Sequence, residues 1–386
     1  MLDIQSMTTA FINGRILTNH GLQRGCAVLV DGDRITGLAL PSDPRVRAAQ
    51  RHDLDGGYLL PGFIDCQVNG GGGVLFNDVP TLEGIRTMAA AHRRYGTTGF
   101  LPTLISDDLE TMRAAIAAVE EAIALKVPGV LGIHIEGPYL APDRKGVHDA
   151  RKFREPTGEE LDLFASLSNG IVLLTLAPER VRPETIRRLR EAGVIVAAGH
   201  TAADYATMRT ALDAGVRGFT HLFNAMSPFT SREPGVTGAA LEDPDSWCGL
   251  IVDGHHVHPA SLRVAIAAKA KGRMMLVTDA MPPVGSANAS FTLNGETITV
   301  RDGICRTADG VLAGSALDMA SAVRNCASML DMPVDEAARM ASTYPAAFLG
   351  LSADRGHISA GGRADLVVLD TELEVRETWI GGVAHS

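Results

Sequence analysis

The sequence predicts a (β/α)8 barrel joined to a small β-sandwich domain that is formed from both chain termini. Two observations predict the barrel. Eight short apolar runs alternate with stretches of helical periodicity, and polar residues suited to catalysis follow several of these runs. The strand-and-turn texture of both chain ends predicts the second domain. The chain has 386 residues, which is long enough for one large domain and one smaller domain.

Both ends of the chain are typical of short strands separated by tight turns. Residues 10–60 carry Asn-Gly, Asp-Gly and Gly-Gly pairs between apolar runs, and residues 356–382 repeat this texture. We therefore expect the small β domain to comprise residues 1–58 and 356–386. The barrel then occupies residues 59–355.

The barrel strands are predicted from β-branched apolar runs that are bounded by turn residues. These runs are 60–66, 98–104, 130–136, 171–176, 194–199, 217–221, 248–252 and 274–279. Between them, stretches such as 82–96, 108–124 and 183–193 have helical spacing, and several end in Gly. An open doubly wound sheet is the alternative, but NGGGGVLF (69–76) lacks the GxGxxG spacing. A hairpin is expected to interrupt the alternation over residues 287–313.

Composition narrows the class of protein. Hydrophobic residues make up 46% and charged residues 21% of the chain, as in a globular, core-forming protein, and the formal net charge of -10 argues against non-specific nucleic-acid binding. No apolar run is long enough to span a membrane, and the first ten residues carry Asp3 without an apolar core, so no signal peptide is expected. The five cysteines form no CxxC pair and indicate reduced thiols in a cytoplasmic protein.

Candidate catalytic residues follow strands three, five, six and eight. Glu136, His200 and His221 form a set of two imidazoles and one carboxylate, which is a good ligand set for zinc or a similar divalent ion and leaves an open position for water. Asp279 follows strand eight, where it can act as a base toward that water and then as an acid toward the leaving group. Any one of these residues alone fits a structural role, but the set favours a metal site.

Strand one raises a question about that metal site. In many metal-dependent hydrolases such a strand ends in His-x-His, whereas here Asp65 is followed by Gln67 and Asn69. Amides are poor metal ligands. The site has therefore lost a metal, moved it, or never held one at this position.

Several motifs together resemble the N-acetylglucosamine-6-phosphate deacetylases of the amidohydrolase superfamily. The motifs are PGFID, GIHIEGPYL, AGHTAADY, THLFNAM, REPG, VDGHHV and VTDAM, with FINGRIL near the start and GHISAGGRADLVVLD near the end. PGFID and the C-terminal motif are shared across the superfamily and specify the fold. HIEGPYL, HLFNAM and REPG are much more specific to the deacetylases.

The resemblance implies one divalent metal ion per subunit, held by the Glu–His–His set. Gln67 and Asn69 match family members that keep a single metal, and no lysine follows strand four (TLAPE) to bridge a second one. The expected ion is zinc, with iron, cobalt or manganese as alternatives.

The resemblance also assigns substrate contacts. His148 contacts the scissile amide and stabilises the developing oxyanion, and Asp279 is the proton carrier. Asn224 and the backbone of Ala225 bind the sugar phosphate, while Arg232 and His256 bind the 6-phosphate, with His255 as the alternative to His256. In the family one of these basic residues comes from a partner subunit, which implies a homodimer.

The implied reaction is hydrolysis of the acetamide of N-acetyl-D-glucosamine 6-phosphate to D-glucosamine 6-phosphate and acetate, in amino-sugar catabolism or recycling. The alternatives are the N-acetylgalactosamine epimer, another amidohydrolase such as a cyclic amidase, and a catalytically silent barrel that serves as a binding protein. The intact set of Glu136, His200, His221 and Asp279 weighs against the last. No nucleic-acid or membrane partner is expected.

Overall fold

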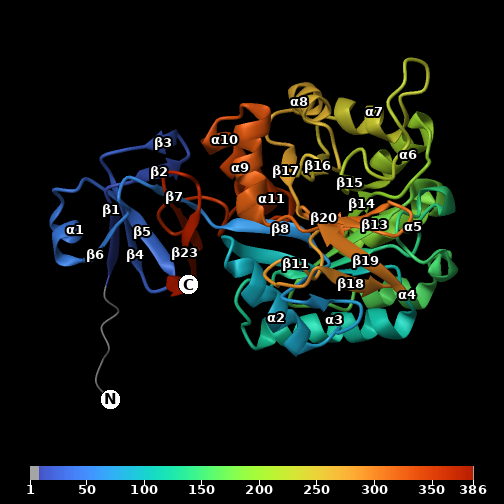
Figure 1. The fold of residues 1–386 in the computed structure, drawn as a ribbon, viewed down its shortest axis with the longest axis horizontal. Coiled ribbons are helices and arrows are strands. Elements are labelled where there is room, and N and C mark those ends of the chain that lie inside the picture. The colour runs from blue at the N-terminus through green and yellow to red at the C-terminus, as the bar shows by residue number, and fades with distance from the viewer. Residues whose placement is uncertain (1–7, 386) are drawn as a thin grey trace.

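A computed structural model describes residues 8–385. The expectation that the first ten residues form no signal peptide falls mostly on residues 1–7, which lie outside the described part. Figure 1 shows two bodies side by side: a small β-rich domain built from strands near both ends of the described chain, and a larger body of strands surrounded by helices. Among the described residues, no helix is long and apolar enough to cross a membrane.

The larger body is built around eight parallel strands in the order β17-β16-β15-β14-β13-β12-β11-β8. Their bounds are β8 Phe63–Val68, β11 Thr97–Ile105, β12 Gly132–Glu136, β13 Ile171–Leu176, β14 Ile195–Ala198, β15 Val216–Phe219, β16 Trp247–Leu250 and β17 Met274–Leu276. The ends of this sheet meet, since Asp279 N donates to Gln67 O at 3.0 Å and Val68 bridges to Ala280. The predicted barrel is confirmed.

All eight predicted strand runs overlap a barrel strand, with one correction. The run 60–66 is divided between two sheets, because Tyr58–Pro61 forms β7 in the small domain and only β8 belongs to the barrel. A continuous apolar run is buried in either sheet, so composition alone cannot show where the chain passes from one to the other.

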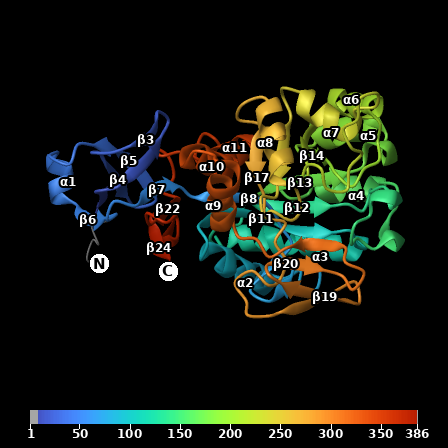
Figure 2. The same cartoon turned by 45° about the horizontal axis from the view of Figure 1, so that its top comes forward.

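Helices cover the outside of the barrel (Figures 1 and 2). They are α2 Leu82–Arg93, α3 Leu109–Ala124, α4 Gly158–Phe164, α5 Pro183–Glu191, α6 Tyr205–Ala214, α7 Gly235–Glu242, α8 Pro259–Ala268, α9 Met319–Leu330, α10 Val334–Ala341 and α11 Thr343–Phe348, with 3-10 turns at Pro142–Arg144, Ala150–Lys152 and Pro178–Arg180. Local chemistry sets their ends: Thr157 and Glu160 form a capping box at α4, and Gly215, with φ of 126°, ends α6.

The small domain consists of two sheets with an apolar layer between them. One sheet has the order β5-β4-β1-β6 and the other β24-β23-β22-β7-β2-β3, so strands from both chain ends share a sheet. The bounds are β1 Thr9–Ile12, β2 Arg15–Thr18, β3 Gly21–Gln23, β4 Ala27–Asp31, β5 Arg34–Ala39, β6 Gln50–Asp53, β22 Leu366–Leu369, β23 Val375–Ile380 and β24 Val383–His385, with helix α1 at Pro44–Ala48. Phe11, Val28, Leu59 and Leu366 belong to the buried layer, as expected for a sandwich.

The segment predicted as a hairpin is larger than expected. It forms a four-stranded antiparallel sheet from β18 Ser290–Leu293, β19 Glu296–Arg301, β20 Ile304–Arg306 and β21 Leu312–Ser315. Its apolar face packs with Ile105 and Met281 near the carboxyl ends of the barrel strands. A second small ribbon, β9 Gly70–Gly71 and β10 Val74–Leu75, follows β8.

Candidate active site

Each of the four candidate catalytic residues lies at or just beyond the carboxyl end of a barrel strand. Glu136 is the last residue of β12, His200 and His221 follow β14 and β15, and Asp279 follows β17. Parallel strands bring their carboxyl ends to the same rim of a barrel, so residues far apart in sequence meet there.

Three of these side chains converge on one point. Glu136 Oε1 lies 3.1 Å from His221 Nε2 and 3.3 Å from His200 Nε2, and the two Nε2 atoms are 3.0 Å apart. The three residues are at most 6% exposed. The ligand atoms of a tetrahedral zinc site, each ~2.0–2.1 Å from the ion, are about 3.4 Å from one another. The spacing and chemistry of this donor set therefore fit a divalent cation.

The backbone at these positions is held in an unusual conformation. His200, His221 and Asp279 have φ values of 49°, 33° and 52°, in the left-handed region that non-glycine residues seldom occupy. Such strain persists only where the surrounding structure imposes it, and it concentrates at functional sites. Here it turns three side chains off their strands and toward one another.

Gln67 and Asn69 connect the cluster to Asp279. Gln67 Nε2 donates to Glu136 Oε1 and to Asp279 Oδ1, at 3.1 Å each, and Asn69 Nδ2 donates to Asp279 Oδ1 at 2.5 Å. Both residues are buried at the end of β8. These amides therefore do not act as ligands here; they donate N–H groups that hold the two carboxylates close together.

A fourth residue, His148, is also close enough to be counted among the ligands. Glu136, His148 and His200 place potential ligand atoms within 4.8 Å of one another. However, His148 Nε2 is 4.0 Å from Glu136 Oε2, whereas His221 Nε2 is 3.1 Å from Glu136 Oε1. The shorter distances favour His221 over His148 as the second imidazole ligand.

The hydrogen bond of His200 decides which of its nitrogens is free. Its Nδ1 lies 2.8 Å from the carbonyl oxygen of Arg144. A carbonyl only accepts, so Nδ1 carries the proton and Nε2 has a lone pair directed at the cluster. This is the arrangement in which metal-binding histidines are normally held.

The two carboxyl groups have opposite ionisation tendencies. Burial opposes the charge on Glu136, but the imidazoles of His200 and His221 beside it hold the pKa of this carboxyl well below its ordinary value. Burial, followed by the charge of Glu136, raises the pKa of Asp279 to about 6. A bound cation would lower the pKa of both groups. Glu136 is therefore suited to stay ionised as a ligand, and Asp279 to exchange a proton near neutral pH.

A cavity of about 340 Å³ opens above the cluster. Asn224, Ala225 and His256 line it, together with Val311, Leu312 and Gly314 from the β20–β21 region. His256 Nδ1 lies 2.6 Å from Asp253 Oδ2, which fixes the direction of its ring, whereas His255 is exposed. His256, and not His255, is thus placed to meet a ligand.

Arg232 is the predicted site residue that the described chain does not bring into this cavity. It lies on the exposed loop between His221 and α7 and is absent from the cavity lining. Of the other predicted residues, all but Gln67 line the cavity, and Gln67 hydrogen-bonds Glu136 and Asp279, which do.

Sequence reasoning missed several residues that orient the site. Arg144 contributes only its carbonyl, and Asp253 is two residues before an ambiguous His-His pair, so neither carries a recognisable signal. The residues of β21 were missed because they come from the segment predicted as a simple hairpin. His134 lies inside the barrel and forms hydrogen bonds with Thr103 and Thr175, so its role is structural.

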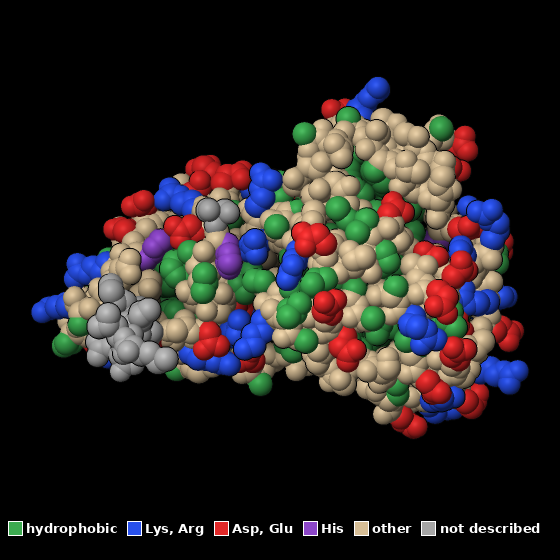
Figure 3. Space-filling view, turned by 90° about the horizontal axis from the view of Figure 1, so that it is seen from below, with side chains coloured by type: hydrophobic (Ala, Val, Ile, Leu, Met, Phe, Trp, Pro, Cys, Tyr) green, Lys and Arg blue, Asp and Glu red, His purple; other side chains and the backbone are tan. Residues whose placement is uncertain are grey.

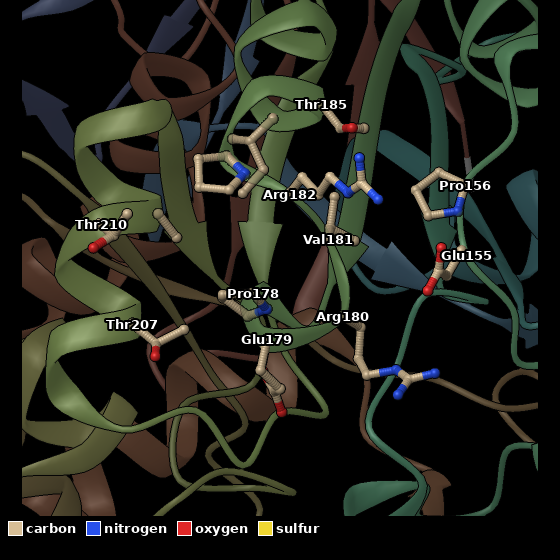
Figure 4. Close-up of a pocket in the computed structure, with 13 residues that line it drawn as sticks. Glu155, Pro156, Pro178, Glu179, Arg180, Val181, Arg182, Thr185, Thr207 and Thr210 are labelled. Carbon is tan, nitrogen blue, oxygen red and sulfur yellow. The ribbon is translucent and has the colours of Figure 1, made fainter.

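A larger hollow lies elsewhere in the described part of the molecule. It measures about 750 Å³ and is lined by residues of the Pro178–Arg180 turn, α5 and α6. Figure 4 shows acidic side chains, Glu155 and Glu179, and basic ones, Arg180 and Arg182, around it. The described residues that line it include no histidine or cysteine. Volume alone therefore does not identify the reactive site.

Comparison with known proteins agrees with this geometry. Residues 58–384 match the amidohydrolase family. The chain is 46% identical to N-acetylgalactosamine-6-phosphate deacetylase of Shewanella sp. (strain ANA-3), covering 95% of this chain and 93% of that protein. It is 36% identical to N-acetylglucosamine-6-phosphate deacetylase of Haemophilus influenzae, covering 97% and 99% respectively.

The fold is similar to a crystal structure of N-acetylglucosamine-6-phosphate deacetylase from Pasteurella multocida. The TM-score is 0.95 at 35% identity, with 98% of this chain and 100% of the other covered. Likeness of this extent includes both the barrel and the small β domain.

Proposed function

We propose that this chain, which belongs to the amidohydrolase family, hydrolyses the acetamide of N-acetyl-D-glucosamine 6-phosphate to D-glucosamine 6-phosphate and acetate. The observation that carries the proposal is the convergence of Glu136, His200 and His221, with Asp279 joined to them through Gln67. The Haemophilus influenzae and Pasteurella multocida relatives bear the name of this activity.

Glu136, His200 and His221 would hold one divalent metal ion. When bound, such an ion supplies a Lewis acid for the carbonyl and lowers the pKa of water to about 7. Zinc suits two imidazoles and one carboxylate, and iron, cobalt and manganese are the alternatives. The structure shows the donor set of two imidazoles and one carboxylate. The choice of zinc among the four ions is part of the proposal.

Asp279 carries the proton through the reaction. Its carboxylate accepts a proton from the attacking water while the new C–O bond forms at the acetyl carbon. It then donates that proton to the amine nitrogen as the C–N bond breaks. Gln67 and Asn69 keep Asp279 Oδ1 directed toward the cluster throughout. His148 would donate a hydrogen bond to the carbonyl oxygen as negative charge develops there.

The remaining cavity residues would bind the sugar phosphate. Asn224, the backbone of Ala225 and His256 line the same cavity as the cluster. Arg232 would complete the phosphate site, because a guanidinium donates two parallel hydrogen bonds to a phosphate. Since Arg232 is exposed and outside the cavity of its own chain, we assign it to the cavity of a partner subunit in a homodimer.

We also assign the protein to the cytoplasm and to amino-sugar catabolism or recycling. The five cysteines are free in the structure, as expected for a reducing compartment. On the face seen in Figure 3, acidic and basic side chains are interspersed and do not form a continuous basic patch. This distribution gives no support to binding of nucleic acid.

A second candidate substrate is N-acetyl-D-galactosamine 6-phosphate. One observation favours it: the Shewanella relative, which is named for this epimer, is more similar in sequence than the Haemophilus relative. The epimers differ only at one ring hydroxyl, so the same metal site and proton carrier would serve either.

The test is acetate release from both 6-phosphates, measured side by side with the unphosphorylated sugars and with chelated enzyme. Turnover that needs both the phosphate and the metal supports the proposal, and the ratio of kcat/KM for the two epimers then decides between the candidates. Absence of turnover on both epimers with every one of the four metals would refute it.

A further inference from the structure

Ser106 is a buried residue that contacts His148 twice. It follows β11 directly and is 5% exposed, while His148 is 3% exposed. Ser106 Oγ lies 2.8 Å from His148 Nδ1, and the Ser106 backbone N–H donates to the same nitrogen at 3.4 Å. Neither residue is adjacent to the other in sequence, so the contact is created by the fold.

These two contacts determine where the proton of His148 lies. A backbone N–H is only a donor, so the nitrogen that it faces must present a lone pair. His148 Nδ1 is therefore unprotonated, and a neutral imidazole then carries its proton on Nε2. His200 is held in the opposite tautomer, because its Nδ1 faces the Arg144 carbonyl, which is only an acceptor.

The protonated nitrogen of His148 is directed at the reactive centre. Its Nε2 is 4.0 Å from Glu136 Oε2, and its ring is inclined at 60° to that of His200, with ring centres 4.5 Å apart. A nitrogen that carries a proton cannot bind a metal until it loses that proton. In this tautomer His148 is a hydrogen-bond donor and not a ligand.

We propose that Ser106 is a positioning residue that holds His148 as the Nε2–H tautomer, and thereby makes it the donor to the substrate carbonyl and keeps it out of the metal ligand set. The proposal rests on the function proposed above for the same cavity. It explains why a cluster of three imidazoles around Glu136 divides into two ligands and one donor.

The position of the Ser106 hydroxyl is itself built into the fold. Gly137, with φ of 87°, packs against it so closely that a Cβ at this glycine would lie 2.2 Å from Ser106 Oγ. The same hydroxyl is 3.4 Å from the carbonyl oxygen of Glu136. The hydroxyl therefore lies in a fixed niche between a proposed metal ligand and His148.

The first test reads the tautomer directly in zinc-loaded wild-type protein. Long-range ¹H–¹⁵N correlation spectra of histidine-labelled protein, with His148 assigned through a His148→Gln variant, distinguish protonated from unprotonated ring nitrogens. We expect His148 Nδ1 unprotonated and Nε2 protonated. Protonated Nδ1, or Nε2 bound to zinc, would overturn the proposal. This readout needs no turnover, so it is independent of the proposed reaction.

The second test separates positioning from general destabilisation. In Ser106→Ala we expect kcat to fall roughly tenfold, the scale of one buried hydrogen bond, with KM and the zinc content per chain nearly unchanged. Ser342→Ala is the matched control, since Ser342 is also buried and its hydroxyl bonds only the Ala338 carbonyl, outside the cavity lining. An unchanged kcat in Ser106→Ala, or an equal loss in Ser342→Ala, would contradict a positioning role.

Discussion

At the scale of single residues, the site separates two carboxyl groups by their surroundings. Glu136 is buried against two imidazoles that favour its charge, whereas Asp279 receives only amide donors and lies near another carboxylate. The same chemical group is therefore suited to act as a ligand in one position and as a proton carrier in the other.

Replacing Asp279 with Asn should abolish turnover without removing the metal. An amide cannot accept the proton of the attacking water, so kcat should fall by at least about a thousandfold. Glu136, His200 and His221 remain, so metal content measured by elemental analysis should stay at the wild-type level. Near-normal kcat in Asp279→Asn would exclude this residue as the proton carrier.

Arg232→Ala tests the assignment of this exposed residue to substrate binding. Loss of a bidentate phosphate contact should raise KM for the 6-phosphate by roughly tenfold or more and change kcat little, because the phosphate is remote from the scissile bond. Arg180→Ala is the control, since Arg180 is also exposed but lines the large hollow at α5 and α6. Equal KM values for Arg232→Ala and the wild type would leave Arg232 without a role in binding.

At the scale of elements, the closure of the barrel depends on a buried carboxyl group. Asp65 of β8 accepts hydrogen bonds from the backbone N–H groups of Gln67 and Thr278, and its other oxygen pairs with the Thr278 hydroxyl. These bonds join β8 to the end of β17. Burial raises the pKa of Asp65 to about 7, so the neutral form is favoured in the folded barrel.

This raised pKa makes stability depend on pH in a definite direction. The contribution of neutral Asp65 is fully present below its unfolded pKa of about 3.9 and is lost as the pH rises through the folded value. The full difference is on the order of 4 kcal/mol. In chelated buffer, the melting temperature of the wild type should therefore fall between pH 5 and 8 relative to that of Asp65→Asn.

Asn is a suitable replacement for this comparison because it resembles the protonated acid. Its oxygen can accept the two backbone N–H groups, and its NH₂ can donate to the Thr278 hydroxyl. A constant difference in melting temperature between the two proteins over this pH range would show that folding does not raise the pKa of Asp65 into this range.

At the scale of the whole molecule, a metal ion bound at the rim would connect strands β12, β14 and β15. Removing it by chelation should lower the melting temperature, and adding zinc back should restore it, because a ligand of the folded state alone stabilises that state. The gain is about 3 kcal/mol when free metal is roughly a hundred times its Kd. In Glu136→Gln, added zinc should give little or no increase. An equal increase in that variant would place the stabilising metal elsewhere.

The two-domain arrangement keeps the reactive centre within one body. The apolar layer of the small domain is separate from the barrel core, and the cavity lining contains no residue before Asn69 or after Gly314. The chain passes from the small domain through the barrel and back, so the first and last described strands, β1 and β24, both lie in the small domain (Figure 1).

The sequence alone was sufficient to predict the barrel and the rim at which its candidate catalytic residues meet. Strand runs have a strong local signal, since burial on both faces demands continuous β-branched apolar residues, and parallel strands place their carboxyl ends on one rim. Glu136, His200, His221 and Asp279 could therefore be assigned to one site without coordinates.

Only the tertiary structure decided how those residues are held. The pairing of Ser106 with His148, of Arg144 with His200 and of Asp253 with His256 depends on loops whose course no residue pattern specifies. The sequence also did not show that the run at residues 60–66 is divided between two sheets, or that Ser290–Ser315 forms a four-stranded sheet. Composition and periodicity report burial, whereas hydrogen-bond partners between distant loops are set by the packed fold.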